Sequence, residues 1–349
     1  MKLIVKETEK PTRDSILLRF DKGFNYKPGQ HGVFKFDVNG ESFTRNYSFN
    51  TSPCLDGDAS IAVRAIPAGV VSNFLINAAK PGMEVVLTDV MGDFVVEPDP
   101  DRKRHLIMFA GGSGITPIIS MIRSILLIET GSIISLIYSN RKIETIIFKD
   151  ELIKLEKEYP DRLKVRYVIT DDETVPPDNL QVFVRGQLNR LIVRKLTKGL
   201  LEEVKLEPEF YLCGPQGFMN LIEEAFSSLN IDQRLIFKEH FFISADKEAD
   251  VYFDNLPLRK IAVRWNGKDN MITVPGGSSI LDAATKAGLD LPHSCEEGQC
   301  GVCRSLLLRG DVKMKKNHIL SNGELEAGQV LLCQGYPVSD DVMVKPING

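Results

Sequence analysis

Four of the six cysteines stand at a spacing that suits an iron–sulfur cluster. Cys295, Cys300 and Cys303 follow the pattern C-x4-C-x2-C, and Cys333 stands alone further along the chain. Four thiolates at this spacing hold a [2Fe–2S] cluster, a carrier of single electrons. A zinc site is the alternative, although zinc ribbons favour two paired C-x2–4-C knuckles. We therefore predict a [2Fe–2S] cluster ligated by these four cysteines, and expect the rest of the chain to supply its electrons.

A glycine-rich turn at residues 111–117 could hold the phosphates of a nucleotide. It follows a continuous apolar run at residues 105–110, which predicts a strand buried on both faces. Gly111, Gly112 and Gly114 would bring backbone amides close to a phosphate at a helix N-terminus. Thr116 suits the N-cap and Pro117 the first helical position. Glycines also build plain tight turns, so the order of strand, loop and helix carries this prediction.

The next predicted strand, residues 133–138, bears on the choice of nucleotide. It ends in the sequence Ser-Asn-Arg-Lys, which places Arg141 near the strand end and no acidic residue beside it. An acid at this point suits the ribose of NAD, whereas an arginine suits the 2′-phosphate of NADP. The pattern favours NADPH over NADH, and a solvated basic turn is the alternative.

Short segments of alternating polarity, broken by Pro-Gly turns, fill residues 2–97 and predict an antiparallel barrel or sandwich. Two stretches within it could bind an anionic ligand. In the first, Arg45 could grip a diphosphate with its planar fork, beside the ring of Tyr47 and the hydroxyl of Ser48. The second would open a helix with amides that form an anion site, and comprises Gly69, Val70, Val71 and Ser72. Either stretch alone could equally be an edge-strand pair or an ordinary capped helix.

Taken together and in this order, the two stretches resemble the R-x-Y-S and G-x-x-S motifs of the ferredoxin-NADP reductase family. The resemblance implies that Arg45 and the residues 69–72 hold the diphosphate of FAD. It also implies that Tyr47 packs on the isoalloxazine and that Ser48 lies near its N5 atom. The G-x-x-S form indicates FAD and not FMN. Ala65 departs from the family, whose members often carry a basic residue there.

Two later segments extend the resemblance. Cys213, Gly214 and Pro215 match the family's C-G-P motif, which implies that the cysteine and glycine lie beside the nicotinamide; a small buried side chain is the alternative. Glu239 and Phe241 are similar to the E-x-F segment that returns to the flavin in related reductases, although a strand-end acid and a core aromatic would look the same. The expected catalytic residues are therefore Tyr47, Ser48, Cys213, Glu239 and Phe241.

Composition and length indicate a multidomain globular protein of the β and α/β classes. The chain has 349 residues, 43% of them hydrophobic and 26% charged, and its net charge of −4 gives no indication of nucleic-acid binding. No apolar run reaches the ~18 residues of a membrane span. The remaining cysteines, Cys54 and Cys213, do not resemble a disulfide framework, which favours a cytoplasmic location.

We expect four segments with distinct folds. They are an antiparallel FAD-binding barrel at 1–100, a Rossmann-like parallel-sheet NAD(P)-binding domain at 101–245, a linker at 246–258, and a [2Fe–2S] domain at 259–349 that resembles the β-grasp of plant-type ferredoxins.

This order of domains describes a path of electrons from NAD(P)H through FAD to the cluster. The whole chain resembles the reductase components of multicomponent oxygenases, among them those of phenylacetyl-CoA epoxidases. The resemblance implies an oxygenase or a desaturase component as the electron acceptor. Two other functions remain open: an electron-relay protein without NAD(P)H turnover of its own, and a redox sensor.

Overall fold

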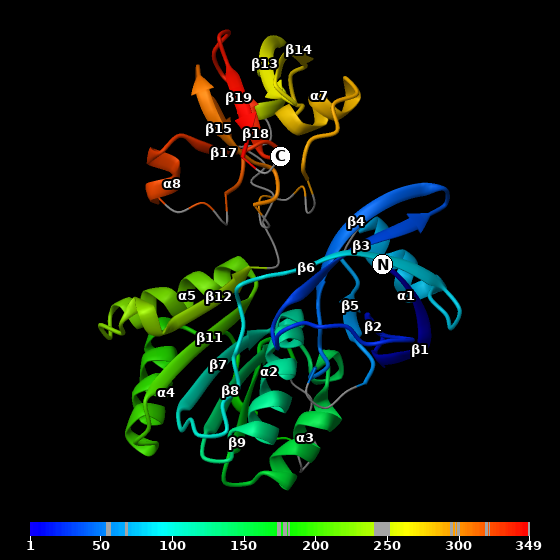
Figure 1. The fold of residues 1–349 in the computed structure, drawn as a ribbon. Helices are drawn as coiled ribbons and strands as arrows, with labels where there is room; N and C mark the ends of the chain where they lie inside the picture. Colours follow the sequence, from blue (N-terminus) through cyan, green and yellow to red (C-terminus); the bar gives the residue numbers. More distant parts are fainter. Residues whose placement is uncertain are drawn as a thin grey trace. The chain divides into compact units, whose positions relative to one another are not determined.

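The computed structural model describes residues 1–53, 57–66, 69–172, 176, 180, 182–240, 252–293, 296, 298, 301–317, 320 and 322–347. The chain divides into two compact units, Met1–Phe242 and Ile243–Gly349 (Figure 1). The first unit holds an antiparallel sheet and a parallel sheet, and the second holds a smaller mixed sheet.

The first sheet of unit 1 is antiparallel, with strand order β4-β3-β6-β1-β2-β5. Alternate residues of its strands point inward, so that Phe34 and Phe36 of β3 are buried in an aromatic core. A bridge between Phe49 and Ile61 joins the two edges and closes the sheet. The predicted barrel is thereby confirmed. Its elements are β1 (Lys2–Thr12), β2 (Ser15–Phe20), β3 (His31–Val38), β4 (Glu41–Ser48), β5 (Ser60–Arg64), α1 (Val70–Ala78) and β6 (Glu84–Met91).

The second sheet is parallel, with order β10-β9-β8-β7-β11-β12, and confirms the predicted Rossmann-like domain. Every residue of β7 is buried, as its apolar run predicts. The strand order reverses between β7 and β11, where ligands bind in open α/β sheets. The elements are β7 (His105–Gly111), α2 (Ile115–Ile128), β8 (Ile133–Asn140), α3 (Lys149–Glu158), β9 (Leu163–Ile169), β10 (Val182–Arg185), α4 (Arg190–Glu203), β11 (Pro208–Gly214), α5 (Gln216–Ser227) and β12 (Ile236–His240), with short 3₁₀ turns η1 (Gly112–Gly114), η2 (Ile143–Thr145) and η3 (Gln233–Leu235).

The expected start of α2 was wrong by two residues. Thr116 is not the N-cap, because η1 runs directly into the helix and Gly114 occupies the capping position. The Thr116 hydroxyl instead donates back to the carbonyl of Ser113 at 3.0 Å.

Helix α2 also binds the barrel to the parallel sheet. Arg123 donates to the carbonyl of Asn50 at 2.6 Å, and the hydroxyls of Ser124 and Ser52 lie 2.7 Å apart in a buried seam. These buried hydrogen bonds join α2 to the barrel, and they therefore hold the barrel and the parallel sheet in one arrangement.

Unit 2 is built on a five-stranded sheet of order β14-β13-β19-β15-β17, in which β13 and β19 are parallel. The helix α7 covers one face with Ile280, Leu281 and Ala284, and completes the predicted β-grasp. Part of the expected linker packs on this unit, since the rings of Phe253 and Tyr336 lie 4.5 Å apart. The elements are β13 (Arg259–Trp265), β14 (Lys268–Val274), α7 (Ile280–Lys286), β15 (Arg304–Arg309), β16 (Val312–Met314), α8 (Asn322–Glu326), β17 (Gln329–Leu331), β18 (Gly335–Pro337) and β19 (Met343–Pro346).

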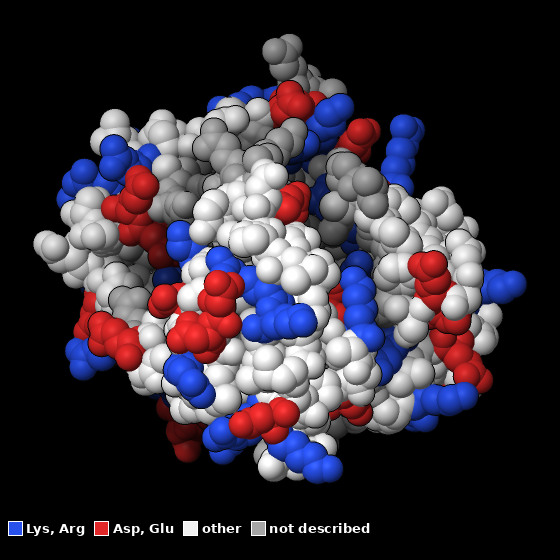
Figure 2. Space-filling view, turned by 90° about the horizontal axis from the view of Figure 1, so that it is seen from above, with Lys and Arg blue, Asp and Glu red and all other residues white. Residues whose placement is uncertain are grey.

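Among the described residues, no helix has the length and apolar character needed to cross a membrane. On the face shown in Figure 2, basic and acidic side chains are interspersed and do not gather by sign.

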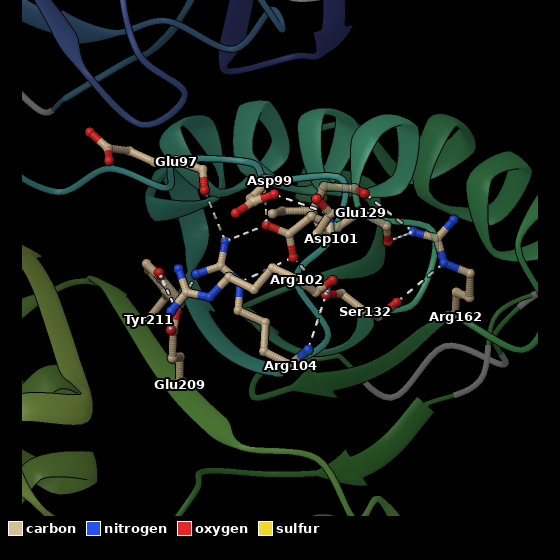
Figure 3. A network of polar contacts seen from close by, with 11 residues as sticks. Glu97, Asp99, Asp101, Arg102, Arg104, Glu129, Ser132, Arg162, Glu209 and Tyr211 are labelled. Atoms are coloured by element: carbon tan, nitrogen blue, oxygen red, sulfur yellow. Dashed lines mark hydrogen bonds and ion pairs between the residues drawn. The ribbon is translucent and has the colours of Figure 1, made fainter.

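A buried charge network lies at the amino-terminal edge of the parallel sheet (Figure 3). Arg104 precedes β7 and binds both oxygens of Glu129, at 2.6 and 3.1 Å, and one oxygen of Glu209 at 2.6 Å. Ser132 and Tyr211 donate to the same two carboxylates. The side chains of Arg104 and Glu129 are at most 3% exposed, so each charge depends on the others for its solvation.

We predict that Arg104→Met lowers the free energy of unfolding by about 3 to 5 kcal/mol, because it removes the buried counter-charge of Glu129 and leaves Glu209 paired with the half-exposed Arg102 alone. The measurement is urea unfolding followed by far-ultraviolet circular dichroism. Arg234→Met is the matched control: it breaks the exposed pair with Asp232, whose loss should cost ~1 kcal/mol or less. Equal unfolding midpoints for the two variants would contradict the role of the network.

Candidate functional site

Two of the four predicted cluster ligands fall among the described residues. Cys303 and Cys333 are buried, and their sulfur atoms lie 3.3 Å apart. Two thiolates bound to one tetrahedral ion at about 2.3 Å would lie about 3.7 Å apart, so this pair suits one metal centre. Cys295 and Cys300 lie outside the described residues.

The loop that leads to Cys303 is held close to the turn between β17 and β18, which carries Cys333. Gly298 has a φ of +74°, and a Cβ there would lie 3.1 Å from the carbonyl of Lys316, so the position requires glycine. The side-chain amide of Gln334, the residue after Cys333, donates to the carbonyl of Glu296 at 2.7 Å. Sequence reasoning missed Gln334, although its position directly after the predicted cluster ligand Cys333 could have indicated it. These contacts fit a metal cage closed from two segments.

Strand β4 carries the residues expected to contact a flavin ring. Tyr47 packs edge-on against Phe36 at 5.9 Å, and burial raises the pKa of its hydroxyl, which therefore stays neutral. Arg45 is exposed; its guanidinium donates to the carbonyl of Thr44 and lies 5.9 Å from the ring of Phe43. No ion pair to a described carboxylate holds Arg45, which leaves its charge for an anionic ligand.

Strand β4 also has buried polar atoms that lack a partner. The hydroxyl of Ser48, a residue 3% exposed, has no hydrogen-bond partner within the described part of the chain, and neither have the side-chain amide atoms of Asn46. Buried polar groups in proteins are nearly always paired. These atoms therefore fit a flavin, whose ring edge carries both donors and acceptors.

The expected diphosphate site lies at the start of α1. Gly69 is the N-cap, and a Cβ there would lie 2.5 Å from the hydroxyl oxygen of Ser72. That oxygen accepts a hydrogen bond from the amide of Ile66 at 3.2 Å, so Ser72 holds the turn that precedes the helix. The amides of the first turn, including Val70 and Val71, have no carbonyl partner inside the helix and suit an anion.

A pocket of about 660 Å³ opens at the carboxyl ends of the parallel strands. It lies where strand order reverses, at the expected nucleotide site. Gly111 and Gly112 line it, whereas Gly114 and Thr116 do not. The barrel contributes Arg13, Asp14, Arg64 and Ala65 to the lining. The rest comes from the carboxyl ends of the parallel strands and the segments that follow them: β7 (111–113), β8 (139–142, Glu144, Thr145), β9 (Thr170, Asp171) and β11 (Pro215, Phe218).

The pocket combines basic and acidic residues at its β8 end. Arg141 and Lys142 line it as predicted, together with Asp171, whose amide donates to the carbonyl of Arg141 at 2.9 Å. Sequence reasoning missed Asp171, because this acid follows β9 and reaches the pocket only through the pairing of β8 with β9.

Arg64 is a second residue that sequence reasoning missed. It ends β5 of the barrel, yet a Cβ on Gly112 would lie 3.1 Å from its guanidinium, so it reaches the glycine turn. Its Nε donates to Asp14 at 2.8 Å and its Nη2 to the carbonyl of Thr145 at 3.3 Å. The sequence could have indicated Arg64, because this arginine directly precedes Ala65, the position where the family often has a basic residue.

The two strand-end turns of the parallel sheet are in direct backbone contact. A Cβ on Gly114 would lie 2.1 Å from the carbonyl oxygen of Cys213, and one on Gly214 would lie 3.0 Å from the Cα of Gly111. Cys213 is fully buried; burial, and secondarily the charge of Glu239, raises the pKa of its thiol, so it remains protonated. It is not suited to be a nucleophile.

Glu239 lies beside Cys213 in the register of β11 and β12, which brings two expected site residues together. Its carboxylate is also close to His31 of the barrel, at 3.2 Å. Phe241 lies outside the described residues.

We predict that Gly114→Ala weakens NADP⁺ binding at least tenfold and destabilises unit 1 by about 1 to 3 kcal/mol, because the added methyl forces the two turns apart. Difference spectroscopy and urea unfolding measure the two effects. Gly199→Ala is the control: this glycine of α4 has open space around its Cβ position, and alanine there should leave binding unchanged and stability equal or higher. Unchanged binding in the Gly114 variant would refute the close contact.

Comparison with known proteins is consistent with this geometry. Three family models match: an oxidoreductase FAD-binding domain at residues 2–95, an oxidoreductase NAD-binding domain at 108–224, and a 2Fe-2S iron-sulfur cluster binding domain at 263–338. Among solved structures, phthalate dioxygenase reductase shares the fold, with a TM-score of 0.67 and 21% identity over 99% of this chain and 97% of that one.

Curated relatives match over nearly the full length. One of the subunits of 1,2-phenylacetyl-CoA epoxidase from Escherichia coli is 33% identical over 98% of this chain and 96% of its own length. The ferredoxin reductase component of 3-ketosteroid-9-alpha-monooxygenase from Mycobacterium tuberculosis is 31% identical over 91% and 85%. The reductase subunit of glycine betaine monooxygenase from Chromohalobacter salexigens is 29% identical over 90% and 86%. The chain therefore belongs to the family of oxygenase reductase components, NAD(P)H-dependent oxidoreductases that join FAD-, NAD- and [2Fe–2S]-binding domains and pass electrons to an oxygenase.

Proposed function

We propose that this chain takes electrons from NADPH and delivers them, through FAD and the [2Fe–2S] cluster, to the oxygenase of a phenylacetyl-CoA epoxidase system. The uptake of electrons from NADPH is supported by the composition of the nucleotide pocket. This pocket is lined both by the glycine turn after β7 and by Arg13 and Arg64 of the barrel. A nucleotide bound there lies against both parts of unit 1, as a reaction between a nicotinamide and a flavin requires.

When bound, FAD accepts a hydride and releases single electrons, which the cluster carries onward at a potential near −400 mV for plant-type centres. The protein contributes position and electrostatics. Arg64 and the amides of Gly111 and Gly112 hold the pyrophosphate of the nucleotide, and Arg141 binds its 2′-phosphate. Arg45 and the α1 amides hold the diphosphate of FAD, while the Ser48 hydroxyl bonds to its ring edge.

The acceptor is inferred from the relatives. The Escherichia coli epoxidase protein matches this chain over almost the whole of both sequences, which supports the same division of labour here. A desaturase is the alternative acceptor, since it would need electrons of the same kind. We place the reaction in the cytoplasm, where thiols stay reduced and cluster cysteines remain available.

We predict that anaerobic titration with NADPH bleaches both the flavin and the iron–sulfur absorbance, at a lower concentration than NADH requires. Arg141→Ala should weaken the response to NADPH by about tenfold to a hundredfold, through loss of a charged hydrogen bond, and leave that to NADH almost unchanged. Arg190→Ala, on an exposed side chain of α4, is the control. If NADH acts first in the unmodified protein, the assignment of Arg141 fails. If neither nucleotide bleaches the flavin, the reductase function itself fails.

We predict that the purified chain supports epoxidation of phenylacetyl-CoA when mixed with the oxygenase component of such an epoxidase and NADPH, with the product detected by mass spectrometry. Cys333→Ser should abolish product formation while NADPH still bleaches the flavin, because the electrons then have no cluster to cross. A desaturase component tested in parallel should turn over slowly or not at all. Faster supply of electrons to the desaturase would overturn the proposed partner.

A further inference from the structure

A hydrogen-bonded pair crosses the seam between the barrel and the parallel sheet. His31 begins β3 and Glu239 stands next to the last residue of β12. The Nδ1 of His31 and the Oε1 of Glu239 lie 3.2 Å apart, and the two side chains are only 14% and 13% exposed. The positions are 208 residues apart in sequence, so the pair exists only because the fold joins the two parts of unit 1.

The second polar atom of each side chain is buried and unpaired. The Nε2 of His31 and the Oε2 of Glu239 have no hydrogen-bond partner in the described part of the structure. If the carboxylate is ionised, the Nδ1 atom must carry the hydrogen that joins the pair. The Oε2 atom then remains as a fixed, buried hydrogen-bond acceptor. Such an acceptor lowers the stability of the folded protein unless a donor reaches it.

The register of the strands shows where this acceptor lies. His31 stands opposite Ser48 in the pairing of β3 with β4, and Glu239 lies beside Cys213 in the pairing of β12 with β11. Residues paired in this way have side chains on the same face of a sheet. The pair therefore connects the residue expected at the flavin ring with the residue expected at the nicotinamide.

The backbone leaves room for the imidazole at one position. Gly92 follows β6 with a φ of +107°, and a Cβ there would lie 2.9 Å from the Nδ1 of His31 and 3.2 Å from its Cε1. Any larger residue at Gly92 would push the ring away from Glu239. The imidazole is thus confined between Gly92 and the carboxylate.

We propose that His31 is a positioning residue for hydride transfer. By donating from Nδ1 to Oε1, it fixes the Glu239 carboxylate so that Oε2 accepts a hydrogen bond from the carboxamide N–H of the nicotinamide that enters beside Cys213. This inference rests on the proposed function, since it requires that a nicotinamide occupies the site. The proposal adds His31, a residue of the barrel, which acts on the nucleotide through the side chain of Glu239 in the parallel sheet.

The test compares two ligands on the holoprotein. NADP⁺ carries the nicotinamide, and 2′,5′-ADP lacks it but keeps the phosphates. In His31→Leu, which removes the donor at similar volume, the dissociation constant for NADP⁺ should rise about tenfold or more, and that for 2′,5′-ADP should change less than about twofold. His31→Asn retains a donor at the place of Nδ1 and should restore most of the NADP⁺ affinity. Both constants come from difference spectra of the flavin, and thermal unfolding of each variant shows whether it folds as the unmodified protein does.

Two results would overturn the proposal. One is unchanged NADP⁺ binding in His31→Leu. The other is equal weakening of NADP⁺ and 2′,5′-ADP, with no rescue by asparagine, which would show that the pair only clamps the two parts of unit 1. Failure of the proposed function looks different, because the unmodified protein would then neither bind these ligands nor be reduced by NADPH.

Discussion

The close approach of two backbone turns governs the organisation of unit 1. The turns that end β7 and β11 are packed so tightly that a Cβ on Gly114 would lie 2.1 Å from the carbonyl of Cys213. Adjacent parallel strands whose connections run in opposite directions leave a crevice at their carboxyl ends, and these glycines form its floor. Loss of that contact would displace both the amides proposed to bind phosphate and the cysteine expected beside the nicotinamide.

The polar residues of unit 1 are divided between two edges of the parallel sheet. At the amino-terminal edge, Arg104 and its carboxylate partners are buried and paired with one another, which costs desolvation but leaves no charge exposed to a ligand. At the carboxyl-terminal edge, Arg141 and Lys142 line an open pocket, and Glu239 keeps one oxygen unpaired among the described residues. Polar groups that are paired inside the protein stabilise the sheet, and groups without a protein partner are the ones able to bind a ligand.

The barrel contributes more to the nucleotide site than a flavin scaffold alone would. Arg64 reaches the glycine turn of the parallel sheet, and His31 contacts Glu239 on its last strand. Both contacts require that the seam between the two parts be rigid, and α2 supplies that rigidity through Arg123 and Ser124. Under the proposed function, side chains of this seam would therefore link the binding of the nucleotide to the orientation of the flavin.

Much of the protein could be predicted from local sequence because its chemistry is local. The spacing of the cysteines, the apolar run of β7 and the glycine turn after it are each features of a short stretch of backbone. Alternating polarity predicted the barrel, the strand–turn–helix order predicted the parallel-sheet domain, and the β-grasp was expected from its resemblance to plant-type ferredoxins. Thr116 shows the limit of this reasoning: a 3₁₀ turn continuous with α2 moved the cap to Gly114, which propensity alone does not reveal. Arg64, Asp171 and the pair of His31 with Glu239 were decided by tertiary structure. Each reaches its site through strand pairing or domain contact across many residues, and no local period or motif encodes which distant side chains such packing brings together.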